Sequence, residues 1–142
     1  MMVPSARSGR LADLLARLKE PDAEKYRTLS AEMLAAAERS FNGRFYRRGY
    51  WADGSALGGE ERIDLLPQVW AAFCGARHAD AALDAALAAL VEEERHLVKL
   101  FTPPFTEAER SPGYLTSYGP GVRENGGQYT HGAVWLALAL AE

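Results

Sequence analysis

Residues 118–142 read YGPGVRENGGQYTHGAVWLALALAE, a glycine-rich loop followed by the longest unbroken apolar run of the chain. That run covers nine residues, 133–141, and residues 129–142 together predict a helix that is apolar almost all round. Such a helix is normally buried on all sides, so another element has to cover it. Because a membrane span needs about 20 apolar residues, we expect no transmembrane segment in this chain.

The upstream sequence predicts further helices, and alanine and leucine, which favour helix, make up 43 of the 142 residues. Residues 22–40 carry a regular apolar stripe with helical spacing. A buried helix is predicted within residues 63–75. Residues 80–98 have the clearest helical pattern, and residues 11–19 predict a short helix after a loose lead-in over residues 1–10.

Turn and loop signals separate these helices. The pair Asn42-Gly43 predicts a tight turn, and the aromatic and basic residues 44–50 predict a short extended segment after it. Residues 99–128 show no periodicity and contain four of the seven prolines and five glycines. A loop of this length in a compact domain is usually functional or disordered, and its tyrosines, phenylalanines and arginines argue against disorder. We therefore predict an all-α, layered fold with its loops on one rim.

Composition and charge narrow the class of protein. With 48% hydrophobic and 25% charged residues, the chain has the composition of an ordinary globular domain. Its net charge of −3 provides no basic field for nucleic acid or for an anionic membrane surface. The single Cys74 cannot form an internal disulfide, which fits a cytoplasmic protein. One cysteine and three scattered histidines match no zinc-binding spacing, so we expect no metal site.

The loop before the last helix has the residues of an oxyanion site. Gly126 and Gly127 allow the backbone to approach a ligand closely. A helix that begins near residues 128–130 directs its first amides and its positive dipole end into the same space. Because His131 lies in that first turn, we predict a phosphate-binding site made of His131, Gly126 and Gly127.

Arg123 and Glu124 precede these glycines and predict a sugar contact. A fixed pair of this kind is suited to gripping vicinal sugar hydroxyls, since one residue donates and the other accepts hydrogen bonds. The residue types alone fit an alternative equally well. In it, the two glycines only form the entry to the helix, His131 is a core residue, and Arg123 and Glu124 form a surface ion pair.

Longer motifs add a family resemblance. The segment PGVRENGGQYTH (120–131), preceded by LFTPPF (100–105) and PGY (112–114), resembles glycoside hydrolase family 94. The resemblance continues upstream through FYRRGYWADGSALG (45–58) and RIDLLPQVWAAFCG (62–75) and covers about residues 24–141. The family comprises inverting phosphorylases of β-linked disaccharides and the phosphorylase-like domain of cyclic β-1,2-glucan synthases. The QYTH form is more similar to the glucan-synthase and chitobiose-phosphorylase branch than to cellobiose phosphorylases.

This resemblance implies an (α/α)6 barrel, in which paired helices form a toroid and the loops of one rim build the site. It implies that His131 binds phosphate and that Arg123 and Glu124 contact the sugar in the acceptor subsite. Tyr118 and Tyr129 are candidates to line the sugar path, because sugar C–H faces stack on aromatic rings, with simple packing as the alternative for each ring. Inorganic phosphate is then a co-substrate, and no cofactor is implied.

The chain departs from the family at the general acid. Inverting phosphorolysis needs this acid on the glycosidic oxygen while phosphate attacks the opposite face of the sugar. In the family the acid is an aspartate in a D-W-N-D-type motif. None of the aspartates of this chain, at positions 13, 22, 53, 64, 80 and 84, lies in such a motif. The sequence around Asp53 resembles a different family segment, so Asp53 is not assigned as the acid, and Asp64 is interpreted as a helix-start residue.

We therefore predict that residues 22–142 form a partial (α/α)6 segment from the later half of a catalytic domain, preceded by the lead-in and short helix of residues 1–21. Such a segment carries phosphate and acceptor-sugar residues for a β-glucoside or β-glucan but is inactive by itself. We expect it to associate with the remainder of the barrel in another chain or with itself. The alternatives are a non-catalytic carbohydrate-binding or interaction fragment, and a decayed remnant.

Overall fold

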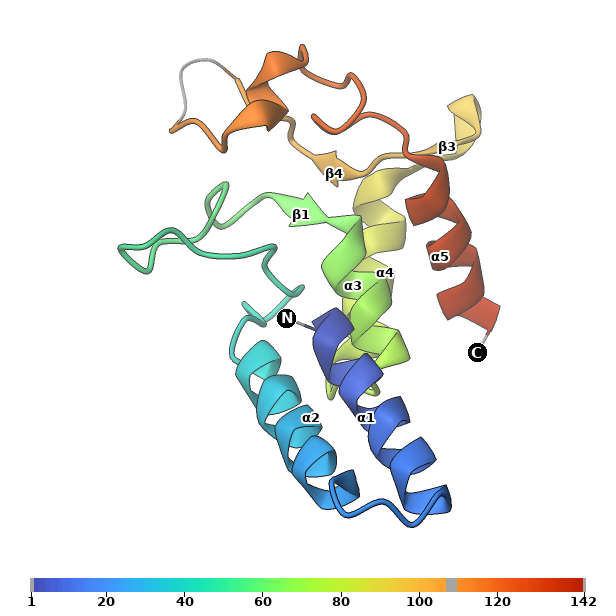
Figure 1. Ribbon diagram of the computed structural model, residues 1–142. Helices are drawn as coiled ribbons and strands as arrows, with labels where there is room; N and C mark the ends of the chain where they lie inside the picture. Colours follow the sequence, from blue (N-terminus) through green and yellow to red (C-terminus); the bar gives the residue numbers. More distant parts are fainter. Residues whose placement is uncertain (1, 107–109, 142) are drawn as a thin grey trace.

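The computed structural model describes residues 2–106 and 110–141, and for residues 2–8 it describes the backbone alone. The helices in these ranges are α1 (Met2–Arg17), α2 (Ala23–Glu38), α3 (Leu65–Phe73), α4 (Ala79–Leu90) and α5 (Thr130–Ala141). In Figure 1, α1 and α2 form an antiparallel hairpin in the lower part of the molecule, while α3, α4 and α5 form a second group. Both α3 and α5 begin at the upper end of this group, where the long loops gather.

Short β-pairs and 3-10 turns accompany the helices. β1 (Ile63–Asp64) pairs antiparallel with β4 (Phe101–Thr102), and β2 (Val91–Glu92) pairs with β3 (Leu97–Val98). The 3-10 turns are η1 (Glu93–Arg95) and η2 (Tyr114–Ser117). The fold is helix-rich, but the prediction of an all-α chain is wrong at these segments. The extended entry to α3 satisfies its backbone groups by pairing with the loop above it.

The helix predicted over residues 80–98 ends at Leu90, which corrects that boundary. Val91 adopts an extended backbone, with φ −88° and ψ 121°, and the chain turns back through His96, whose φ of 53° is left-handed. This turn lets Val98 pair with Val91. The apolar residues that continued the helical spacing are therefore partners in a hairpin.

The loose lead-in predicted for residues 1–10 is also wrong, because the backbone is helical from Met2 onwards. A proline is tolerated in the first turn of a helix, so Pro4 does not prevent this. α1 packs along α2, and this tertiary contact supports a segment whose own sequence is a weak helix former.

The helices predicted within residues 22–40, 63–75 and 129–142 are confirmed by α2, α3 and α5. The start of α3 shows the local reason. Asp64 occupies the N-cap position, and its side chain accepts a hydrogen bond from the backbone N–H of Leu66 at 2.9 Å. The interpretation of Asp64 as a helix-start residue is therefore confirmed.

The main core lies between α3, α4 and α5. Gly132 brings α5 so near to α3 that a Cβ at this position would lie 3.1 Å from Leu65. The buried side chains of this core are Phe45, Ile63, Leu65, Val69, Leu83, Ala86, Leu90, Leu136 and Ala139. A separate apolar cluster under the upper loops consists of Leu100, Phe101, Phe105 and Leu115. The loops are thus anchored on a core of their own.

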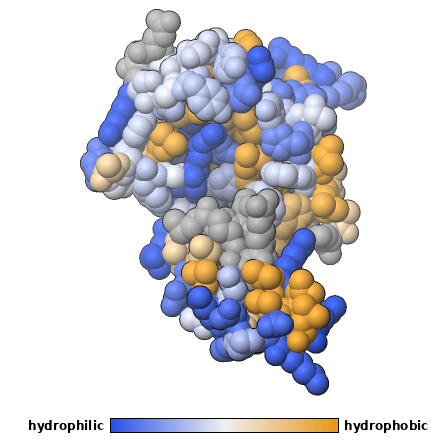
Figure 2. Space-filling view, viewed as in Figure 1, coloured by the Kyte–Doolittle hydropathy of each residue, from blue (hydrophilic) through white to orange (hydrophobic). Residues whose placement is uncertain are grey.

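Within the described residues, α5 buries only one face. Val134, Leu138 and Leu140 are each half exposed or more. Figure 2 shows hydrophobic surface along the right-hand edge, where Figure 1 places α5. The expectation that this helix is covered on all sides is therefore not met by these residues alone. None of the described helices has the length and apolar character that crossing a membrane requires.

Candidate functional site

Residues 118–131, which we name the rim loop, comprise the loop before α5 and its first two residues, and they are built around a buried asparagine. Asn125 is 1% exposed, and its Nδ2 donates hydrogen bonds to the carbonyls of Phe105 at 3.0 Å and Tyr118 at 2.8 Å. Its Oδ1 accepts a hydrogen bond from the backbone N–H of Phe105 at 2.8 Å. Sequence reasoning missed Asn125, whose only signal was a polar residue directly before two glycines. Its bonds fix the shape of the rim loop.

Gly126 and Gly127 are also buried, and close contacts within the protein require both. A Cβ at Gly126 would lie 2.9 Å from the carbonyl oxygen of Phe101, and one at Gly127 would lie 2.7 Å from the backbone nitrogen of Arg123. The N–H of Gly127 donates a hydrogen bond to the carbonyl of Arg123 at 3.0 Å. The two glycines therefore allow close contacts within the protein itself, whereas the sequence predicted a close approach to a ligand. Phosphate binding by either glycine stays a prediction.

Arg123 and Glu124 lie side by side on the rim loop. Arg123 has a left-handed φ of 47°, its guanidinium lies 5.0 Å from the ring centroid of Tyr118, and its Nε is 3.6 Å from Oε2 of Glu124. The hydroxyl of Tyr129 donates to Oε1 of Glu124 at 3.2 Å, and this hydrogen bond raises the pKa of Tyr129. Oε2 of Glu124 is buried without a hydrogen-bond partner among the described residues. An exposed donor group therefore stands beside an unsatisfied acceptor.

His131 lies in the first turn of α5 and is exposed, so it is not the core residue of the alternative interpretation. Its ring centroid is 4.4 Å from that of Tyr129 and 5.0 Å from that of Trp135, with both pairs edge-to-face. The first backbone N–H groups of a helix have no partner within it, and the helix dipole makes this end positive. An anion at the start of α5 would therefore be within reach of His131.

Comparison with known proteins gives this architecture a family. Residues 10–142 match the catalytic domain of the glycosyl hydrolase 94 superfamily. The chain belongs to this superfamily. It is similar to cyclic beta-(1,2)-glucan synthase NdvB of Rhizobium meliloti (strain 1021), with 46% identity over 122 residues. That match covers 81% of this chain but 4% of the relative, so the chain spans a small part of that protein's length. The family resemblance of the sequence is confirmed.

Two aspartates of this glycosyl hydrolase 94 chain, Asp53 and Asp64, are both held by hydrogen bonds or ion pairs within the protein. Hydrogen bonds from the hydroxyl and backbone N–H of Ser55, and then from Arg110, lower the pKa of Asp53 to about 2. Asp64 is 2% exposed and forms an ion pair with Arg48. Burial raises the pKa of the Asp64 carboxyl, and Arg48 acts in the opposite direction. Asp53 is ionised at neutral pH and has no proton to donate there.

Five of the site residues predicted from the sequence are exposed or half-buried, and in the structure each contacts the next. They are Tyr118, Arg123, Glu124, Tyr129 and His131. Arg62 is a second residue that sequence reasoning missed. It is buried and donates hydrogen bonds to the carbonyls of Gly58 at 2.9 Å and Pro103 at 2.6 Å. Over residues 2–106 and 110–141, no group of three His, Cys, Asp or Glu side chains is placed to hold a metal ion.

Proposed function

We propose that the rim loop forms the phosphate and acceptor-sugar part of a site for inverting phosphorolysis of β-linked glucosides, which yields a sugar 1-phosphate. Membership of the glycosyl hydrolase 94 superfamily and the similarity to a cyclic glucan synthase support a carbohydrate-active site. In this reaction a phosphate oxygen attacks the anomeric carbon, the glycosidic C–O bond breaks, and a general acid protonates the leaving oxygen. The chain supplies binding groups, and we assign the acid to a part of a complete domain outside these 142 residues.

The observation that carries the proposal is the unsatisfied Oε2 of Glu124 beside the guanidinium of Arg123. A buried acceptor that lacks a donor costs about 1–3 kcal/mol. Once the exposed side chain of Arg123 moves aside, a sugar hydroxyl supplies the missing donor to Oε2 of Glu124, while a hydroxyl oxygen accepts a hydrogen bond from Arg123. Tyr118 and Tyr129 hold this pair from either side and offer ring surface to the sugar. Phosphate is assigned to the start of α5 beside His131.

Titration of the purified chain tests this assignment. We expect inorganic phosphate to shift the NMR signals of His131, and a β-1,2-linked glucose disaccharide to shift those of Tyr129. The variant Glu124→Gln weakens disaccharide binding, and His131→Ala weakens phosphate binding. His96→Asn, which changes an exposed histidine on the β2–β3 hairpin and keeps a residue tolerant of left-handed φ, leaves both unchanged. Unchanged binding by all three variants would refute the assignment.

A non-catalytic carbohydrate-binding segment is the second candidate, because Asp53 and Asp64 are both engaged. Both candidate functions predict that the chain binds the sugar. An activity assay of the chain alone then shows whether it catalyses the reaction without the rest of a catalytic domain. We expect no phosphate-dependent release of glucose 1-phosphate from a β-glucobiose by the chain alone. Release that Asp53→Asn abolishes would instead make Asp53 the acid.

The exposed face of α5 supports a proposal about assembly. We infer that the helices belong to an (α/α)6 barrel in the cytoplasm, whose remaining helices, or a second copy of this chain, cover Val134, Leu138 and Leu140. Because these side chains are about half exposed, each gains on burial about half of the roughly 1.5–3 kcal/mol that a fully exposed one gains. In sedimentation at micromolar concentration the chain should associate, and Leu138→Lys should shift it towards monomer. Leu14→Lys, at a similarly exposed position on α1, should not. A monomeric wild-type chain would contradict association of the chain with itself through this face.

A further inference from the structure

A cleft of about 600 Å³ lies beside β1 and is separate from the rim loop. Its walls come from the end of α2, residues 47–50 and the first turns of α3. The side chains of Arg48, Tyr50, Asp64 and Trp70 are part of its lining. Sites for small ligands have volumes of about 300–1,000 Å³ and combine aromatic walls with a few fixed polar groups. The cleft has this character, and no part of the proposed phosphorolysis site uses it.

The polar groups of the cleft are already held in place by the protein. Arg48 pairs with Asp64, and Arg47 pairs with Glu60. The guanidinium of Arg48 also lies 5.4 Å from the ring centroid of Phe101 on β4. In the described part of the chain, the buried Nε of Arg47 has no hydrogen-bond partner. Because both arginines are ion-paired, they offer donors whose charge is compensated, which suits a neutral hydroxyl group better than an anion.

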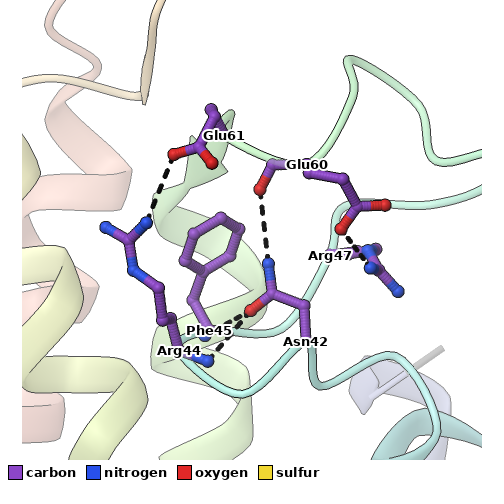
Figure 3. Close-up of polar contacts among 6 residues, drawn as sticks. All are labelled: Asn42, Arg44, Phe45, Arg47, Glu60 and Glu61. Carbon is purple, nitrogen blue, oxygen red and sulfur yellow. Dashed lines mark hydrogen bonds and ion pairs between the residues drawn. The ribbon is translucent and has the colours of Figure 1, made fainter.

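The turn of residues 42–45, which precedes these arginines, is held by hydrogen bonds from Asn42 and by an ion pair of Arg44 (Figure 3). Oδ1 of Asn42 accepts hydrogen bonds from the backbone N–H groups of Arg44 at 3.0 Å and Phe45 at 2.9 Å. Nδ2 of Asn42 donates to the carbonyl of Glu60 at 3.3 Å, and Arg44 pairs with Glu61 at 3.2 Å. These contacts confirm the predicted turn. They also place the wall of the cleft before a ligand enters.

A line of aromatic rings joins the cleft to the rim loop. Trp70 of α3 lies 5.3 Å from Trp135 of α5, measured between ring centroids. Trp135 lies 5.0 Å from His131, which in turn lies 4.4 Å from Tyr129 on the rim loop. The cleft is therefore connected to the rim loop through ring contacts between α3 and α5, in which Trp70 and Trp135 are partly buried. The exposed parts of such rings offer packing area to the C–H faces of sugars.

We propose that this cleft is a further sugar-binding subsite, which holds a glucosyl unit of an oligosaccharide whose other end lies at the rim loop. Its location and the neutral, polyhydroxylated class of its ligand follow from the cleft and its ion-paired arginines. The choice of glucose as the sugar rests on the proposed function. Tyr50, which is half-exposed, and Trp70 pack against the sugar, and Arg47 and Arg48 donate to its hydroxyls.

Titration of the full chain with β-1,2-linked glucose oligomers tests the proposal. The probes are the disaccharide and the tetrasaccharide, followed by NMR or tryptophan fluorescence. We expect the tetrasaccharide to bind more tightly, and Tyr50→Ala to weaken its binding by about 3-fold to 10-fold, as expected for one aromatic packing contact, without weakening the disaccharide. Tyr26→Ala, on α2 outside the cleft, is the matched control and changes neither. Because Arg48→Met leaves Asp64 unpaired, the exposed Tyr50 is the primary variant.

The outcomes separate this proposal from the proposed function. If Tyr50→Ala leaves tetrasaccharide binding unchanged while Glu124→Gln weakens both sugars, the subsite is refuted and the proposed function stands. If Tyr50→Ala weakens only the tetrasaccharide and Glu124→Gln has no effect, the subsite stands and the rim-loop assignment fails. Equal binding of both oligomers by the wild-type chain refutes the subsite. A chain that binds neither sugar refutes both proposals.

Discussion

Two irregular regions of this chain, residues 41–62 and the rim loop, are held in different ways. The rim loop is closed by a buried side chain, Asn125, that hydrogen-bonds to backbone groups. Within residues 41–62, Tyr46 is buried and its backbone hydrogen-bonds to Gln68, but the turn before it is held at the surface, by Asn42 and by ion pairs such as Arg44–Glu61. A buried partner that loses its hydrogen bond also lacks water, whereas an exposed ion pair contributes about 0–1 kcal/mol. The rim loop is therefore expected to depend more strongly on its asparagine than the turn at Asn42 does.

The two asparagines provide the largest test of this comparison, because the side chain of each makes three hydrogen bonds to backbone groups. We expect Asn125→Ala to lower the free energy of unfolding by at least about 3 kcal/mol, since it leaves buried backbone groups unpaired. Asn42→Ala is expected to cost about 1 kcal/mol, because water reaches its partners. Urea unfolding of both variants measures the difference. Equal losses would show that burial does not distinguish the two regions.

The glycines of the two regions provide a second test. A Cβ at Gly127 would collide with the backbone of Arg123, so we expect Gly127→Ala to cost about 2–3 kcal/mol and to displace Arg123. Gly43 has a φ of +97°, and no atom lies within 4 Å of the position that a Cβ would take, so Gly43→Ala should cost about 1 kcal/mol, from backbone strain alone. Thermal unfolding gives both values, and NMR should show shifts at Arg123 only for Gly127→Ala. Shifts there for both variants would remove the distinction.

The smallest effect is expected at Asp53, where the loop of residues 41–62 meets Arg110 through exposed groups. Hydrogen bonds from Ser55 lower the pKa of Asp53 from 3.8 to about 2, so the folded chain binds this proton less readily than the unfolded chain. The stabilisation is present above pH 3.8 and is lost as the pH falls to about 2. Asp53→Asn and Ser55→Ala should each slightly reduce the change in the free energy of unfolding between about pH 2 and pH 3.8. A profile that is unchanged in both would show that the contact contributes nothing.

Much of the helical framework could be predicted because its signals are local. The stripe of α2 and the capping residue Asp64 of α3 act within one or two turns, so a single stretch of sequence contains them. The same use of apolar spacing predicted that the helix α4 continues to residue 98, whereas it ends at Leu90. Residues beyond Leu90 keep an apolar spacing, but pairing between Val91 and Val98 outweighs it, and that pairing depends on a turn whose geometry no local pattern showed.

By itself, the sequence determined the family and the residue types of the rim loop, because the segment from Pro120 to His131 is long and distinctive. Only the tertiary structure decided which residues act together. Asn125 meets Phe105, Arg48 meets Asp64, and the cleft is assembled from three separate segments. These contacts join residues far apart in the chain, and the entropy lost in closing such loops is repaid only by the packing of the whole fold. A local sequence pattern therefore cannot predict these contacts.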